Sequence, residues 1–227
     1  MYFFVTGTDT EVGKTTVTVE LISAITRLGR TCIGLKPIAA GREFSNGTLI
    51  NEDVEKLRRV SVPVITVGQI CRYELHTPCA PHLAATLDGV AINKTAVIKH
   101  IEQSKTLADH VFVEGVGGFN VPLNEDWGTA DLALDLGFPV ILVVGMRLGC
   151  INHALLTYEA IKTRGLQLAG WIANEVESDF DHCDENVSTI AGFLGDPIGR
   201  LPYLTDQVAS GTTDYFSLDN LLNFSEG

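Results

Sequence analysis

The chain has 227 residues, of which 45% are hydrophobic and 19% are charged, so it can form a sizeable core and is not expected to be disordered. Its net charge is −12, and such an acidic surface repels nucleic acid backbones and anionic lipids, so we expect no nucleic acid or membrane partner. The length suits one ordinary domain, which we expect to span residues 1–227.

Short apolar runs alternate with helical patterns along the whole chain. Runs rich in β-branched or apolar residues predict strands at residues 2–6, 31–36, 110–114, 140–145, 168–174 and 198–201. Apolar residues at helical spacing predict helices at residues 14–28, 93–107 and 151–164. Strands that are apolar throughout are typical of parallel sheets. We therefore predict an α/β fold in which a doubly wound, mostly parallel sheet lies between two layers of helices.

A phosphate-binding loop follows the first predicted strand. Gly13-Lys14-Thr15 is the last part of a P-loop, and it lies between a strand and a helix, where that motif belongs. The backbone N–H groups of such a loop bind phosphate, with Lys14 reaching the β- and γ-phosphates and the Thr15 hydroxyl binding Mg²⁺. The spacing departs from the strict motif, because only five residues separate Gly7 from Gly13. Outside this context, Gly-Lys-Thr would indicate only a glycine-capped helix start.

Charged side chains follow two further strands. Glu114 ends the apolar run 110–114 and is followed by a glycine-rich loop. In phosphoryl-transfer sites, the acid that binds Mg²⁺ has a similar position at the end of a strand. Asp53 is a weaker candidate for another metal ligand, because an acid there also suits the first turn of a helix. Lys36 ends the second predicted strand, where a buried lysine needs an anionic ligand or partner. Considered alone, Glu114 could also be a surface residue in a turn. Lys36 could also be a lysine at a strand end whose side chain reaches water.

The cysteines and the apolar segments indicate the cellular compartment. The chain has five cysteines and no Cys-x-x-Cys pair, which argues against a disulfide framework and a zinc site. The apolar residues 2–5 are too few for a signal peptide, and the apolar stretch 138–146 is interrupted by Pro139 and Gly145. We therefore expect a soluble, cytoplasmic protein.

Five motifs occur together in one order. They are Gly7-Thr8-Asp9-Thr10-Glu11-Val12-Gly13-Lys14-Thr15, Lys36-Pro37, Val113-Glu114-Gly115-Val116-Gly117-Gly118, Leu148-Gly149-Cys150-Ile151-Asn152-His153-Ala154 and Gly170-Trp171-Ile172-Ala173-Asn174. This set closely resembles the dethiobiotin synthetases, over residues 1 to about 204. The resemblance implies a P-loop NTPase-like fold, a homodimer and a ligase of biotin biosynthesis. Its substrates would be 7,8-diaminononanoate, CO₂ (from bicarbonate) and ATP.

The resemblance also implies roles for individual residues. ATP would contact Glu11, Val12, Gly13, Lys14, Thr15, Thr16, Asp53, Glu114, Gly115, Val116, Gly117, Asn174, Glu175, Pro202, Tyr203 and Leu204. Asn174 would read the adenine. Mg²⁺ would be bound by Thr15, Asp53 and Glu114. The catalytic set would be Lys36, Lys14, Thr10 and Glu11. Diaminononanoate would contact Lys36, Ala40, Gly149, Cys150, Ile151 and Asn152, the last four belonging to the other subunit, so that the substrate site lies at the subunit interface.

In the family, a substrate carbamate forms first, ATP phosphorylates it, and the second amine closes the ring with loss of phosphate. No side-chain nucleophile is needed, so Cys150 is expected to be only a small residue in a tight turn. The sequence departs from the family at Ala40, where a serine hydroxyl often contacts the substrate. Residues 77–82 resemble a family segment near the substrate pocket, and their two prolines are expected to shape a loop.

Two other functions are compatible with a P-loop. One is a dimeric nucleotide switch that recruits a partner protein or a membrane. Such proteins usually carry an additional lysine early in the loop and a basic helix at the end, whereas this chain has Thr8, Asp9 and Thr10 early in the loop and an acidic segment at residues 217–227. The other is a different ATP-dependent, amide-forming synthetase of the same fold. The substrate that stimulates phosphate release from ATP in the presence of bicarbonate would distinguish these functions.

Overall fold

The computed structural model describes residues 1–45, 47–203, 215–222 and 224, and its centre is a parallel sheet. Within these residues the sheet has six strands in the order β10-β9-β8-β1-β7-β2, with every neighbouring pair parallel. Its strands are β1 (Tyr2–Gly7), β2 (Cys32–Leu35), β7 (His110–Glu114), β8 (Val140–Met146), β9 (Leu168–Glu175) and β10 (Gly199–Leu201). All six lie where the sequence predicts them, and the predicted parallel α/β fold is confirmed.

Four shorter strands lie outside this sheet. β3 (Ile38–Ala40) pairs in parallel with β6 (Tyr73–Leu75), and β4 (Glu43–Ser45) forms an antiparallel hairpin with β5 (Thr48–Ile50). None of them is predicted from the sequence, because each strand has only three residues and lies outside a longer apolar run. All four follow β2 along the chain.

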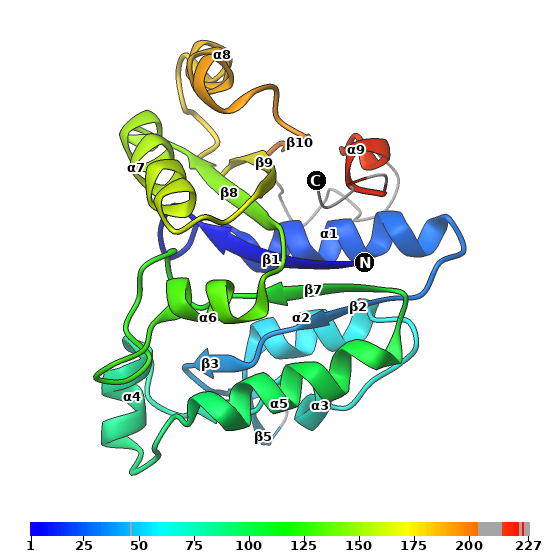
Figure 1. Ribbon diagram of the computed structural model, residues 1–227, viewed down its shortest axis with the longest axis vertical. Helices are drawn as coiled ribbons and strands as arrows, with labels where there is room; N and C mark the ends of the chain where they lie inside the picture. The colour runs from blue at the N-terminus through cyan, green and yellow to red at the C-terminus, as the bar shows by residue number, and fades with distance from the viewer. Residues whose placement is uncertain (46, 204–214, 223, 225–227) are drawn as a thin grey trace.

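Helices flank the sheet, with α7 and α8 near one end and α2, α3 and α5 near the other (Figure 1). The helices are α1 (Lys14–Arg27), α2 (Glu52–Val60), α3 (Val67–Ile70), α4 (Pro81–Leu87), α5 (Lys94–Ser104), α6 (Thr129–Leu136), α7 (Cys150–Thr163), α8 (Cys183–Leu194) and α9 (Leu218–Leu222), with a 3-10 turn η1 (Lys105–Leu107). α1, α5 and α7 are the three predicted helices. In the part of the chain that the structure describes, no helix is both long and apolar enough to cross a membrane.

The sheet is buried on both faces, as its apolar strands require. Leu142 and Val144 of β8 point toward one face, where they pack in a cluster with residues of α7 and α8. Ile141 and Val143 alternate with them and join the larger core, which includes Leu21 of α1. Because β7 lies between β1 and β2, the carboxyl ends of these three strands are side by side. The fold therefore brings the three predicted polar segments to one edge of the sheet.

Candidate active site

The loop between β1 and α1 has a backbone that depends on glycine. Gly13 has a left-handed φ of 80°, and a Cβ atom built on it would lie 2.1 Å from Asn174 Nδ2. Asn174, at the end of β9, donates from Nδ2 to the Val12 carbonyl at 2.9 Å. The end of a distant strand therefore shapes this loop, and a side chain at position 13 would displace the amide that supports it.

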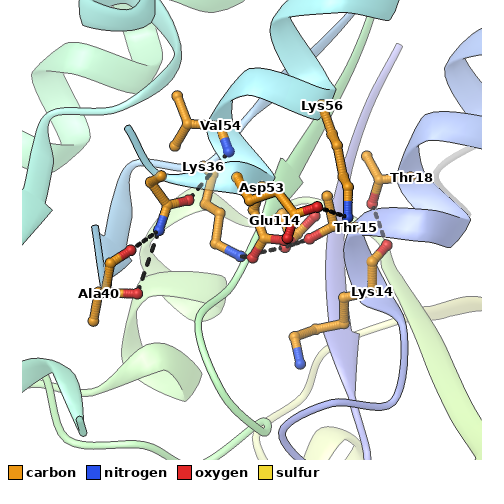
Figure 2. A network of polar contacts seen from close by, with 12 residues as sticks. Lys14, Thr15, Thr18, Lys36, Ala40, Asp53, Val54, Lys56 and Glu114 are labelled. Carbon is orange, nitrogen blue, oxygen red and sulfur yellow. Dashed lines mark hydrogen bonds and ion pairs between the residues drawn. The ribbon is translucent and has the colours of Figure 1, made fainter. Parts of the chain in front are cut away.

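Lys14 is the first residue of α1 and is 7% exposed. Its Nζ donates to the carbonyl oxygen of Asp9 at 2.9 Å, within the same loop, and in Figure 2 it points away from the other charged groups. Burial lowers the pKa of Lys14 to about 8. The nearby Glu114 carboxylate raises this pKa and the Lys36 charge lowers it, and both effects are smaller than that of burial. Lys14 is therefore a buried cation that has no carboxylate partner of its own in the loop.

Lys36 lies directly after β2 and joins two carboxylates. Its Nζ donates to Glu114 Oε1 at 2.7 Å and forms an ion pair with Asp53 Oδ2 (Figure 2). Thr15 Oγ1 donates to the same Glu114 oxygen at 2.7 Å. The other oxygen of Glu114, Oε2, is buried and has no hydrogen-bond partner among the described residues. One buried acceptor of the cluster therefore has no partner within the part of the chain that the structure describes.

The charges in this cluster stabilise one another. Burial lowers the pKa of Lys36, but the Glu114 and Asp53 carboxylates outweigh burial and raise it well above its ordinary value. Burial raises the pKa of Asp53, but the Lys36 charge, together with hydrogen bonds from Lys36 and Thr15, outweighs burial and lowers it below its ordinary value. At neutral pH, the cluster therefore contains a charged lysine and an ionised Asp53.

The oxygen atoms of the cluster fit a magnesium ion. Mg²⁺ prefers carboxylate and hydroxyl oxygens and usually keeps water and substrate phosphate among its ligands. Thr15, Asp53 and Glu114 supply such oxygens, and Glu114 Oε2 has no other partner in the described chain. No group of three or more His, Cys, Asp or Glu side chains among the described residues could hold a metal. A metal bound here would therefore depend on phosphate and water for its remaining ligands.

A cavity of about 680 Å³ lies over this cluster. It is lined by Thr10, Glu11, Gly13, Lys14, Thr15, Thr16, Lys36, Ala40, Asp53, Lys56, Pro78, Cys79, Ala80, Pro81, Glu114, Val116, Gly117 and Val121. All four predicted catalytic residues are in this set, as are the three predicted metal ligands. Gly115 is buried beside the lining, where a Cβ would meet the Phe4 ring at 3.1 Å.

Part of this lining was not assigned from the sequence. Lys56 follows Asp53 by one helical turn of α2, so the helical spacing is the signal that could have found it. Pro78 and Pro81 line the cavity and belong to the segment whose prolines were expected to shape a loop. Val121 is carried by the loop that follows the glycines after β7, and we find no motif that marks it.

Several predicted site residues do not line this cavity. Gly149, Cys150, Ile151 and Asn152 form the turn and first residues of α7, with Gly149 at a φ of 93°. Cys150 is buried, its Sγ donates to Asn186 Oδ1 at 3.5 Å, and burial raises the pKa of its thiol. A buried thiol of raised pKa is a poor nucleophile, as expected for a small packing residue.

The predicted base-binding residues lie toward the other end of the sheet. Glu175 ends β9 and accepts a hydrogen bond from Arg200 Nε at 2.9 Å. Pro202 and Tyr203 are exposed after β10. Leu204 lies outside the described residues. Asn174 lies between these residues and the phosphate loop, which it contacts through Val12.

Comparison with known proteins identifies the family. A family model described as an AAA domain matches residues 2–210. The ATP-dependent dethiobiotin synthetase BioD of Ralstonia nicotianae is 47% identical over 202 residues, which is 88% of each chain. The enzyme of the same name from Aromatoleum aromaticum is 49% identical over 89% of this chain and 90% of its own. The chain belongs to the dethiobiotin synthetase family.

Solved structures support the fold assignment of this synthetase family member. The MinC:MinD cell division protein complex of Aquifex aeolicus matches with a TM-score of 0.56 and 14% identity, over 91% of this chain and 83% of that one. A ParA family ATPase from Chlorobium tepidum matches with a TM-score of 0.53 and 11% identity, over 90% and 85%. At such low identities, the matches show only the shared P-loop α/β fold.

Proposed function

We propose that this chain is an ATP-dependent dethiobiotin synthetase, which converts 7,8-diaminononanoate, CO₂ and ATP to dethiobiotin, ADP and phosphate in biotin biosynthesis. The observation that carries the proposal is the 47% identity to a synthetase of this name over 88% of both chains. A cavity lined by two buried lysines, Lys14 and Lys36, and by the buried acid Glu114 supports it. One P-loop domain, residues 1–227, would carry the reaction in the cytoplasm.

The chemistry needs no nucleophile from the protein. One amine of the substrate attacks CO₂ and loses a proton, which gives a carbamate. A carbamate oxygen then attacks the γ-phosphate of ATP and displaces ADP. Finally, the second amine attacks the carbamoyl carbon, closes the ureido ring and releases phosphate. Both amines belong to one molecule, so ring closure is favoured by proximity.

The side chains of the cavity would stabilise the charge that develops in these steps. Lys36 and Lys14 both line the cavity, so both can hold a positive charge near an anionic carbamate and the transferred phosphate. Lys36 would exchange one of its carboxylate partners for the carbamate. Thr10 and Glu11 line the same cavity and would position the diamine. Ala40 offers no hydroxyl there, so the substrate contact at this position would come from the backbone.

ATP would lie along the phosphate loop, with its triphosphate on the N–H groups of residues 11–16 and at the start of α1. Asn174 would read the adenine, beside Glu175, Pro202, Tyr203 and Leu204, while Gly115, Val116 and Gly117 would line the far side of the phosphates. Thr15, Asp53 and Glu114 would hold Mg²⁺. When bound, the ion would supply positive charge to the β- and γ-phosphates.

The pKa of Lys14 predicts a pH dependence. Because burial lowers the pKa of Lys14 to about 8, the free enzyme loses this charge as the pH rises through that value. We expect kcat/KM for ATP to fall above pH 8 in steady-state assays. The Lys14→Arg variant should retain its charge there, so any activity it has should not fall over the same range. An identical alkaline decline in both proteins would contradict the assignment to Lys14.

The proposal includes a homodimer in which each site is shared. Diaminononanoate has its carboxylate far from its two amines, so it needs a second anion site outside the lysine cluster. The segment Gly149–Asn152 forms the turn and the first residues of α7, and it does not line the cavity of its own chain. We therefore assign it to the cavity of the other subunit, where its N–H groups and Asn152 would bind the carboxylate.

Mixing two inactive variants tests the shared site. Lys14→Gln removes a phosphate-loop charge, and Asn152→Glu places a negative charge in the turn. Random mixing should restore roughly a quarter of wild-type activity, because half of the dimers are mixed and each has one intact site of two. Activity is measured after subunit exchange is confirmed by native mass spectrometry. No recovery after exchange would show that each site is built within one chain.

Product analysis tests the function itself. The chain is incubated with diaminononanoate, ¹³C-bicarbonate, Mg²⁺ and ATP, and the product is examined by mass spectrometry. We expect dethiobiotin with one ¹³C in its ureido carbon, and phosphate release that depends on the diamine. Phosphate release that is independent of the diamine, with no labelled product, would favour a nucleotide switch instead.

A further inference from the structure

Arg147 connects the phosphate loop to the turn before α7. Its Nη2 lies 2.7 Å from Asp9 Oδ2, although 138 positions separate the two residues in the chain. Arg147 also begins the turn before α7, because the N–H of Cys150 donates to its carbonyl at 3.0 Å. β8 and β1 are neighbours in the sheet, so the segments that follow them meet at the carboxyl edge. No step of the proposed reaction uses this ion pair.

Asp9 is the residue through which this contact reaches the loop. Its carbonyl accepts from Lys14 Nζ at 2.9 Å, and its Oδ1 accepts from the N–H of Thr10 at 2.8 Å. A Cβ atom built on Gly118 would lie 3.8 Å from Asp9 Cα, so the loop after β7 also packs against it. The position of Asp9 therefore influences both Lys14 and Thr10.

The charge of Asp9 is unfavourable for an anionic ligand. Its side chain is 47% exposed and belongs to the loop that would receive a triphosphate. A carboxylate without a partner there would repel the nucleotide, since charges a few ångströms apart interact appreciably even near the surface. Arg147, which is 31% exposed, supplies the compensating positive charge.

We propose that Arg147 is a positioning residue for ATP: through its ion pair with Asp9, it fixes the phosphate loop and cancels a negative charge beside the triphosphate. This proposal rests on the ATP site of the proposed function. It assigns to Arg147 an effect mainly on nucleotide affinity, because Arg147 acts on Lys14 and Thr10 through Asp9 and not by direct contact. The KM for ATP should therefore change while kcat at saturating ATP stays close to that of the wild type.

A double-variant cycle tests the proposal, with titration of a fluorescent ATP analogue and Mg²⁺. We expect Arg147→Met to raise the dissociation constant roughly fivefold, from the lost pair and the exposed Asp9 charge. Combining it with Asp9→Asn should restore the affinity to within about twofold of Asp9→Asn alone, because the repelling charge is then gone. Arg147→Lys retains the positive charge and should stay within about twofold of the wild type.

Arg164 provides a matched control on the opposite end of α7. It pairs with Asp131 at 2.9 Å, and the two side chains are 33% and 41% exposed, similar to Arg147 and Asp9. Arg164→Met should leave the affinity for the analogue unchanged. Thermal melting of every variant shows whether the chain remains folded. If the Arg147→Met variant does not fold, the Arg147→Lys and Asp9→Asn variants carry the test.

The possible results separate the explanations. Wild-type affinity in Arg147→Met would overturn the proposal. Weak binding that Asp9→Asn does not relieve would overturn it too, because the arginine would then contact the nucleotide directly. If wild-type protein does not bind the analogue, the proposed ATP site fails instead, and the role of Arg147 fails with it.

Discussion

Replacing Lys14 with glutamine is expected to reduce kcat at least about a hundredfold, the usual effect of removing one preorganised electrostatic donor. In the free protein, Lys14 Nζ contacts only a carbonyl of its own loop among the contacts that the structure describes, so its charge is available to the transferred phosphate. The same contact is a weak one for stability, so the fold should persist. The measurements are kcat under saturating substrates, the circular dichroism spectrum and the melting temperature.

Lys94 supplies a control for the Lys14 variant. It lies at the start of α5, pairs with Asp135 at 2.8 Å and is 51% exposed, away from the residues that line the cavity. Lys94→Gln should therefore have nearly wild-type kcat. If Lys14→Gln also has nearly wild-type kcat and an unchanged melting temperature, Lys14 does not act on phosphate and the phosphate-loop assignment is wrong.

Sequence reasoning predicted the central sheet because burial on both faces leaves a clear signal. A strand such as β8 is buried along its whole length, so its run of apolar residues is interrupted by no polar position. The short strands β3 and β6 leave no such signal, since their pairing depends on contacts between distant segments. The helix α4 was also not predicted, because its seven residues make only about two turns and are too few to show a helical period.

The edge of the sheet on which the site lies was also predictable, but the contacts within it were not. Parallel strand ends must meet at one edge, so Lys36 and Glu114 were expected near the phosphate loop. Nothing in the local sequence shows that Lys36 bridges Glu114 and Asp53, because strand order decides which ends are neighbours. The contact of Asn174 with Val12 joins residues 162 positions apart and has the same origin.

Replacing Lys36 with methionine is expected to abolish turnover and also to destabilise the protein. The Glu114 side chain is fully buried and Lys36 donates to it at 2.7 Å, so removing the lysine leaves a buried carboxylate without its counter-charge. Breaking a buried pair in this way costs about 3–5 kcal/mol of unfolding free energy. For a chain of this size, that loss lowers the melting temperature by roughly 10 °C. Calorimetry at neutral pH measures it.

Two further variants separate the buried pair from the general loss of a lysine. Lys94→Met breaks an exposed pair and should cost at most about 1 kcal/mol. The double variant Lys36→Met with Glu114→Gln removes both buried charges and should recover much of the lost stability, while remaining inactive. Equal stability of Lys36→Met and the wild type would show that the pair contributes nothing to folding.

The effect of Lys36→Met should also depend on pH and on magnesium. The Lys36 charge and the hydrogen bonds from Lys36 and Thr15 together outweigh burial and hold the pKa of Asp53 below its ordinary 3.8. This part of the stability is therefore complete above that pH and is lost as the pH falls through the lower, folded-state value. The difference between the two proteins should therefore shrink in acid.

At neutral pH, Mg²⁺ should raise the melting temperature of Lys36→Met more than that of the wild type, because the ion and the lysine compete for the same two carboxylates. Glu114→Gln in the double variant should remove this additional response. If Mg²⁺ stabilises Lys36→Met no more than the wild type even when ATP is present, Asp53 and Glu114 do not form the metal site.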